Sequence, residues 1–246
     1  MRTKGMNRRV GRGAEGVNRA CGWAWPAGES AGAPSANVAA CRVPPDVTWN
    51  APAQVPPLVR VRPHPRYPRI ARAVLRASVL ARPWTDEVFR ATSPEWATAE
   101  HLQSGLGGIV AAGRWNAMGV FRIIYASLTP EGALSEALAR ARHRGIADSQ
   151  AMPLVVSALR VRLAAVLDLR TDEAGDALAV SSGALAREDW RAAMAGGRES
   201  LSQAVGRAAH AAGLEGMIVP GVVAANLLIF PDHAARPGSL RIARRG

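Results

Sequence analysis

Three side chains that could act together on one substrate lie at equal intervals in the middle of this 246-residue sequence. Arg114, Tyr125 and Glu136 are each separated by 11 residues. An arginine has a planar fork that fits phosphate, and a tyrosine ring can stack on a flat heterocycle. A glutamate can stabilise a developing positive charge. The set suggests a site for a phosphate-bearing ligand with an aromatic group.

The elements expected around these residues can bring them to one cleft. Residues 105–113 are glycine-rich, so the backbone there can approach a ligand closely. Residues 120–126 are β-branched and aromatic and predict a strand that ends near Tyr125. The Thr-Pro-Glu segment at 129–131 is typical of a helix start, and Gly145 is typical of the end of that helix. Taken singly, each of the three side chains also has an ordinary structural explanation, as a solvated arginine, a core tyrosine or a surface glutamate.

The rest of the pattern predicts an α+β fold, a mixed sheet with flanking helices. Strands and helices interleave, but their connections are irregular, which favours a mixed sheet over a doubly wound one. Short helices and loops are expected at 172–193, and an apolar piece at 70–80 could form one helix docked on the domain. The other expected elements are strands at 86–90, 154–169, 216–219, 226–230 and 240–243, and a helix at 198–212.

The chain is expected to divide into a disordered tail, residues 1–83, and a domain, residues 84–246. The tail is rich in Pro, Gly and Ala, and it holds 14 of the 31 Lys and Arg but only 3 of the 19 Asp and Glu. It therefore carries nearly all of the net charge of +12. Such a tail could be an arm for nucleic acid or a membrane surface, a solvated linker, or the result of a start codon placed too far upstream. Few aromatic residues are interleaved with the basic ones, which favours the last two explanations.

Several functional classes receive no support from the sequence. No run of 18 apolar residues occurs, so a membrane span is not expected. Arg8-Arg9 is not followed by an apolar run, so a secretory or twin-arginine signal is unsupported and a cytoplasmic location is expected. Cys21 and Cys41 lack metal-ligand spacing, and the five histidines are scattered, so no metal site is expected.

Residues 88–232 resemble the RES domain family in the order and spacing of several short motifs. An early Phe-Arg dipeptide is followed by a Gly-Arg-Trp-Asn-x-x-Gly segment, a Tyr-x-Ser strand end and an Ala-x-x-Glu helix, here at 89–90, 113–119, 125–127 and 133–136. Later segments that resemble the family lie at 166–169, 188–190, 213–216 and 226–231. The sequence departs from the family at Gly221, where a serine usually follows the Val-Pro of the penultimate strand. If that serine is needed, Gly221→Ser is expected to raise activity.

The resemblance implies an ADP-ribosyltransferase-like fold and an enzyme that breaks the nicotinamide–ribose bond of NAD⁺, as a glycohydrolase or a phosphorylase. Breaking that bond builds positive charge on the ribose, which a carboxylate can stabilise. The family motifs place three catalytic residues, with Glu136 facing the ribose, Tyr125 holding the nicotinamide and Arg114 clamping the pyrophosphate. The expected substrate-binding residues are Arg90, Asn116, Ser127 and Asn226.

The resemblance further implies an intracellular toxin that a small helix-turn-helix antitoxin of Xre type neutralises. NAD⁺ would be a substrate, with no cofactor required, no membrane partner, and nucleic acid reached only through the antitoxin. Three alternatives remain open from the sequence. They are transfer of ADP-ribose to a macromolecule, a catalytically impaired RES-fold binding protein, and a nucleic-acid-binding protein that uses the basic tail.

Overall fold

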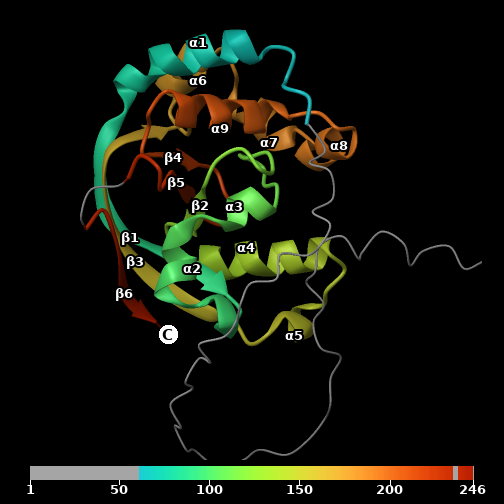
Figure 1. Ribbon diagram of the computed structural model, residues 1–246, viewed down its shortest axis with the longest axis vertical. Helices are drawn as coiled ribbons and strands as arrows, with labels where there is room; N and C mark the ends of the chain where they lie inside the picture. Colours follow the sequence, from blue (N-terminus) through green and yellow to red (C-terminus); the bar gives the residue numbers. More distant parts are fainter. Residues whose placement is uncertain (1–60, 235–237, 246) are drawn as a thin grey trace, which may run out of the picture. The chain divides into compact units, whose positions relative to one another are not determined.

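A computed structural model describes residues 61–234 and 238–245, drawn in colour in Figure 1. The expected tail at 1–60, with Cys21 and Cys41, lies outside the described residues. The described residues form one compact unit. Within the described ranges, none of the helices has the length and apolar character needed to cross a bilayer.

The strands of the described residues form one six-stranded mixed sheet in the order β1-β2-β5-β4-β3-β6, which confirms the predicted fold class. β3 and β4 run parallel, whereas the other pairs are antiparallel. β1 pairs with β3 as well as with β2, so the pairing closes into a ring of five strands. The strands are β1 (Arg82–Thr92), β2 (Ile124–Ser127), β3 (Val155–Asp168), β4 (Gly216–Val219), β5 (Asn226–Ile229) and β6 (Leu240–Arg245).

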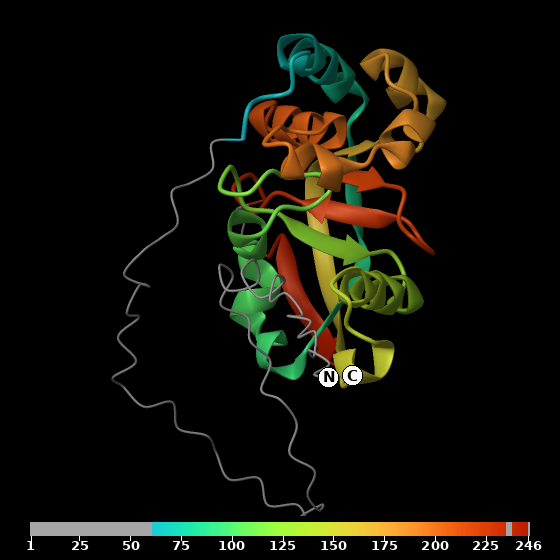
Figure 2. The same cartoon turned by 90° about the vertical axis from the view of Figure 1, so that its right-hand side faces the viewer.

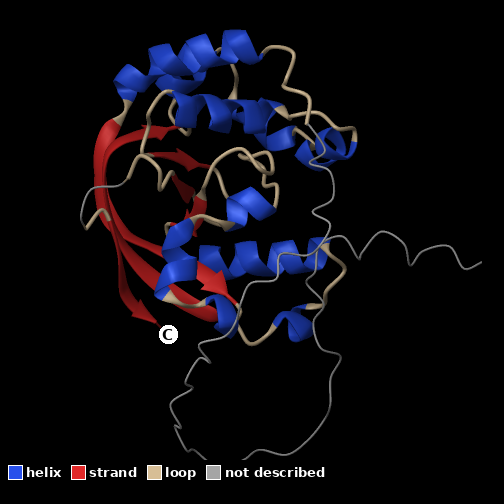
Figure 3. Cartoon of the chain, viewed as in Figure 1, coloured by secondary structure: helices blue, strands red, loops and turns tan. Residues whose placement is uncertain are grey.

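Helices lie at both ends of these strands, as Figures 1 and 3 show and the turned view in Figure 2 supports. One group contains α1 (Tyr67–Ala77), α6 (Asp172–Leu178), α7 (Ser182–Arg187), α8 (Trp190–Ala195) and α9 (Leu201–Ala211). The other contains α2 (Ala99–Ser104), α3 (Gly107–Val110), α4 (Pro130–His143) and α5 (Asp148–Ala151). Two 3₁₀ turns, Ser78–Leu80 and Pro94–Trp96, follow α1 and β1.

Local sequence explains where the helix that carries Glu136 begins. The Thr129 hydroxyl accepts a hydrogen bond from the Gly132 amide at 3.0 Å, and Pro130 occupies the first turn. An N-cap of this kind satisfies a backbone donor that has no partner within the helix. The predicted start of this helix is therefore confirmed, and α4 packs against β1.

The folded unit begins earlier than the predicted boundary at residue 84. α1 packs against α9, and its apolar face, with Ile70 and Val74, is buried in the main core cluster. The centroid of the Tyr67 ring lies 3.3 Å from the Arg207 guanidinium carbon, and Arg207 pairs with the buried Glu199 carboxylate at 2.7 Å. Residues 61–83 therefore belong to the domain, because α9 would lose its apolar cover without them.

Several elements differ in length from the sequence-based expectation. β1 is longer than the predicted 86–90 because it pairs with β3 from Arg82 to Thr92. β2 begins only at Ile124, where its pairing with β5 begins. The glycine-rich segment at 105–113 contains the short helix α3. These differences follow from long-range pairing, which local propensity does not encode.

Candidate active site

A small cavity of about 50 Å³ lies beside β1, the end of β2, the start of β5 and one face of α4. A space of this size has room for a few water molecules or one small polar group. It brings together five of the seven predicted site residues, namely Arg90, Tyr125, Ser127, Glu136 and Asn226. Its other lining residues are Phe89, Ala91, Thr92, Ala126, Ala133, Ala137 and Arg140.

The Glu136 carboxylate is fixed through one of its two oxygens. Oε1 accepts hydrogen bonds from the Val222 amide at 2.9 Å and from the Asn226 side-chain nitrogen at 2.8 Å. Oε2 has no hydrogen bond to any described residue. The carboxylate is thus held in one orientation with an acceptor left for a ligand.

Asn226 and Ser127 form the buried side of the same cavity. Asn226 is 8% exposed, and its Oδ1 has no hydrogen-bond partner among the described residues. Ser127 is 2% exposed, and its hydroxyl donates only a long bond, 3.5 Å, to the Ala225 carbonyl. A buried acceptor without a partner is costly unless a ligand or water supplies a donor.

The atoms around Gly221 leave no room for a serine side chain. A Cβ at residue 221 would overlap the Ala224 carbonyl oxygen and would lie 2.7 Å from the Asn226 nitrogen and 3.0 Å from Glu136 Oε1. The loop therefore fits against the carboxylate only because residue 221 lacks a side chain. This geometry argues against the expectation that Gly221→Ser raises activity.

Tyr125 and Asn116 form a hydrogen-bonded pair behind the cavity. The Tyr125 hydroxyl donates to Asn116 Oδ1 at 2.8 Å and accepts from the Trp115 amide at 3.0 Å. The Asn116 nitrogen donates to the Gly108 and Ala111 carbonyls at 2.7 and 3.1 Å. Burial raises the pKa of Tyr125 well above its usual value, so the hydroxyl stays neutral. Asn116 is completely buried and is not part of the cavity lining, so it positions Tyr125.

Arg114 also lies outside the set of residues that line the cavity. Its Nη1 donates to the Leu185 carbonyl at 2.9 Å and to the Glu188 carbonyl at 3.2 Å. Burial raises the pKa of Tyr125, and the positive charge of Arg114 acts to lower it, so the two side chains are neighbours. Arg114 thus connects the Gly-Arg-Trp-Asn-x-x-Gly segment at 113–119 to the 185–188 segment.

Arg90 and Arg140 are the two cations of the cavity. Arg90 lies on β1 and donates from Nη1 to the Leu102 carbonyl. Burial, with a smaller contribution from the charge of Arg140, lowers the pKa of Arg90 to about 10. Arg140 was not among the site residues predicted from the sequence, although its position four residues after Glu136 places both on one helix face.

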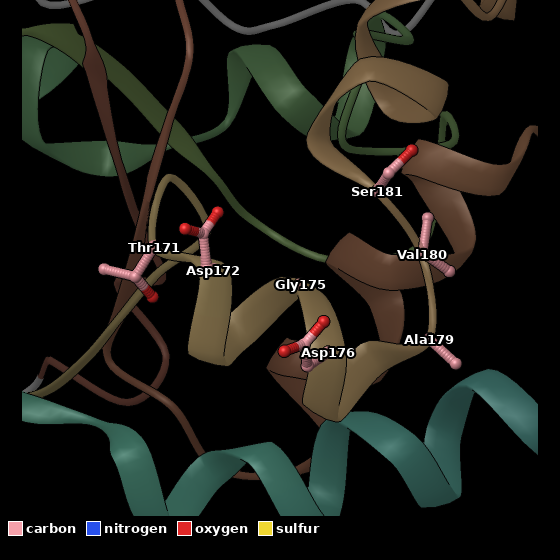
Figure 4. Close-up of a pocket in the computed structure, with 7 residues that line it drawn as sticks. All are labelled: Thr171, Asp172, Gly175, Asp176, Ala179, Val180 and Ser181. Carbon is pink, nitrogen blue, oxygen red and sulfur yellow. The ribbon is translucent and has the colours of Figure 1, made fainter.

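A wider hollow of about 310 Å³ borders α6 and is shown in Figure 4. Among the described residues its lining contains Asp172 and Asp176 but no arginine or lysine, so it does not suit an anionic ligand. Elsewhere in the described residues, no group of three or more His, Cys, Asp or Glu is placed to hold a metal ion. The Glu136 cavity is therefore the stronger candidate for a site that takes phosphate-bearing compounds.

The mixed sheet, the 113–119 segment behind Tyr125 and the Glu136 carboxylate on α4 belong to a chain whose sequence matches a known class of domain. The model of the RES domain family matches residues 87–244, and this chain belongs to that family.

Individual relatives agree with this assignment. Over 165 residues the chain is 27% identical to proteins named NAD(+) phosphorylase MbcT from Mycobacterium tuberculosis and Mycobacterium bovis, covering 65% of this chain and 80% of each relative. A crystal structure of the M. tuberculosis MbcT–MbcA toxin–antitoxin complex contains a chain with a similar fold. The TM-score is 0.59 at 23% identity, over 72% of this chain and 92% of that one.

Proposed function

We propose that this protein cleaves the nicotinamide–ribose bond of NAD⁺ and transfers the ADP-ribosyl group to phosphate or water. The observation that supports this most strongly is the Glu136 carboxylate, held by two donors on Oε1 with Oε2 left for a ligand. The homology to proteins named NAD(+) phosphorylase adds support.

The chemistry follows from the charge that develops during bond cleavage. As the bond to the positively charged pyridinium nitrogen breaks, its electron pair moves to nicotinamide and positive charge spreads over C1″ and the ring oxygen of the ribose. The fixed Glu136 carboxylate stabilises that charge without having to reorganise. Asn226 Oδ1, which lacks a partner within the described protein, accepts a hydrogen bond from a ribose hydroxyl.

The remaining site residues bind or position the substrate. Tyr125 offers a ring to the nicotinamide, and its hydroxyl is held by Asn116. Arg90 offers its free guanidinium nitrogens to a phosphate, whereas Arg114 fixes the 185–188 segment beside the site. A cavity of about 50 Å³ takes one small polar group, so most of the dinucleotide lies on the surface outside it.

We further propose that the protein is the toxin of a toxin–antitoxin pair, because a relative is known in a complex of this kind. A protein antitoxin that contains an Xre-type helix-turn-helix would cover the site and supply any contact with DNA. Expression of the chain alone should stop bacterial growth, and expression with the neighbouring antitoxin gene should restore it. Growth arrest that persists in the Glu136→Gln variant would contradict a toxic action through NAD⁺.

The enzymatic proposal is tested by the release of nicotinamide from NAD⁺, measured chromatographically with the purified full chain. Glu136→Gln keeps the size of the side chain but removes its charge, and it should lower kcat by about 10²–10³-fold. Glu131→Gln, on the exposed first turn of the same helix, is the matched control and should retain activity.

Product analysis separates the alternatives. Free ADP-ribose or its 1″-phosphate supports the proposal, whereas ADP-ribose attached to protein or nucleic acid shows a macromolecular transferase. If the well-folded full chain releases no nicotinamide, with or without phosphate, the enzymatic proposal is wrong and a binding role remains.

A further inference from the structure

Arg140 is a cation of the site whose guanidinium group has no direct hydrogen-bonding partner in the described residues. Within the described part of the chain, its guanidinium group makes no side-chain hydrogen bond and no ion pair; the negative charge of Glu136, one helical turn earlier, acts on it without a direct contact. The residue as a whole is exposed, but burial lowers the pKa of Arg140, so its guanidinium group faces the Glu136 cavity rather than open solvent. A cation in such a position is free to bind a ligand.

Two further donors of the same cavity also have unused capacity. Thr92 Oγ1 is buried and has no partner in the described residues. Arg90 uses only Nη1 for backbone carbonyls, which leaves Nη2 and Nε. Hydroxyl and guanidinium donors together match the oxygens of a phosphate.

The charge balance of the cavity also favours an anion. Its lining contains two arginines and one carboxylate, and that carboxylate already accepts two hydrogen bonds from the protein. The charge of Arg140 adds to burial in lowering the pKa of Arg90, so the two guanidinium groups repel each other. An anion between them would relieve this repulsion.

On the basis of the proposed function, we infer that Arg140, Arg90 and Thr92 form a phosphate subsite that delivers inorganic phosphate to the ribose. An oxygen of HPO₄²⁻ forms a bond to C1″ as the C1″–N bond breaks, and the bonding pair neutralises the pyridinium nitrogen. The products are nicotinamide and ADP-ribose 1″-phosphate, first as the monoanionic phosphate ester. No further reactant is required. Arg140 thereby sets the preference for phosphate over water as the acceptor.

The subsite is tested directly by calorimetric titration of inorganic phosphate into the full chain at low ionic strength. Arg140→Ala should weaken phosphate binding by about tenfold or more, the effect of losing one charge-assisted contact. Arg144→Ala is the matched control, because it removes the same charge from the exposed end of α4 without touching the cavity. Equal phosphate binding by the wild type and Arg140→Ala, or no binding by the wild type, overturns the subsite.

Steady-state kinetics then show whether Arg140 binds free phosphate or the diphosphate of NAD⁺. If Arg140 holds the acceptor, Arg140→Ala raises the KM for phosphate at least tenfold, changes the KM for NAD⁺ little and increases the share of ADP-ribose among the products. If Arg140 instead holds the diphosphate of NAD⁺, the KM for NAD⁺ rises with or without added phosphate, and the inference of an acceptor site is wrong. Phosphate binding that depends on Arg140 without any nicotinamide release would overturn the proposed function and leave the subsite standing.

Discussion

Gly221→Ser is the substitution for which the family pattern and this structure predict opposite results. The new Cβ would meet the Ala224 carbonyl oxygen and would lie 2.7 Å from the nitrogen that Asn226 donates to Glu136. The loop must therefore move, and the Val222 amide, which also donates to the carboxylate, moves with it. We expect a less stable protein with a poorly oriented Glu136.

The size of the effect can be estimated from these contacts. Overpacking of this kind costs about 1–3 kcal/mol in folding free energy. Loss of one hydrogen bond to a carboxylate costs about 1.5–3 kcal/mol, which corresponds to a fall in rate of about 10- to 150-fold if it is felt in the transition state. Urea unfolding and nicotinamide release measure the two effects.

A matched glycine substitution controls for the general cost of adding a side chain. Gly107→Ala, on α3, adds its Cβ into open space and should leave stability and rate near those of the wild type. If Gly221→Ser is as stable as the wild type and faster, the loop accommodates a serine and our reading of its packing is refuted.

Three further substitutions test the surroundings of the site. Tyr125→Phe leaves Asn116 Oδ1 and a backbone amide without their hydroxyl partner, so urea unfolding should show a loss of about 1–3 kcal/mol; an unchanged midpoint would contradict this role. Arg114→Ala removes two bonds to backbone carbonyls and should lower the unfolding midpoint, whereas a pure rise in the KM for NAD⁺ would mean direct binding. Burial lowers the pKa of His210 below its usual value of about 6.5. As pH drops below about 6.5, the unfolded chain therefore binds a proton before the folded chain does, and the unfolding free energy should fall. His210→Gln should make that dependence weaker, and an equal slope in both proteins would rule out His210 as its source.

The sequence alone was sufficient for the fold class, the family and several element boundaries. The Thr129 cap, the alternation within β3 and the motif segments are local signals, and each depends on residues close together in the chain. Local signals of this kind fix which side chains share a strand end or a helix face. The inclusion of Tyr125 and Glu136 in one cavity therefore followed from the motifs that position them.

Only the tertiary structure decided which of the candidate groups face that cavity. Arg114 and Asn116 belong to the motif, yet their polar atoms are occupied by distant carbonyls and by Tyr125. Arg140, outside the motif, lines the cavity because α4 packs against β1. The lack of room at Gly221 depends on a loop that folds back onto Glu136, 85 residues earlier in the chain. Such contacts arise from the packing of elements far apart in sequence, and residue spacing along the chain carries no information about them.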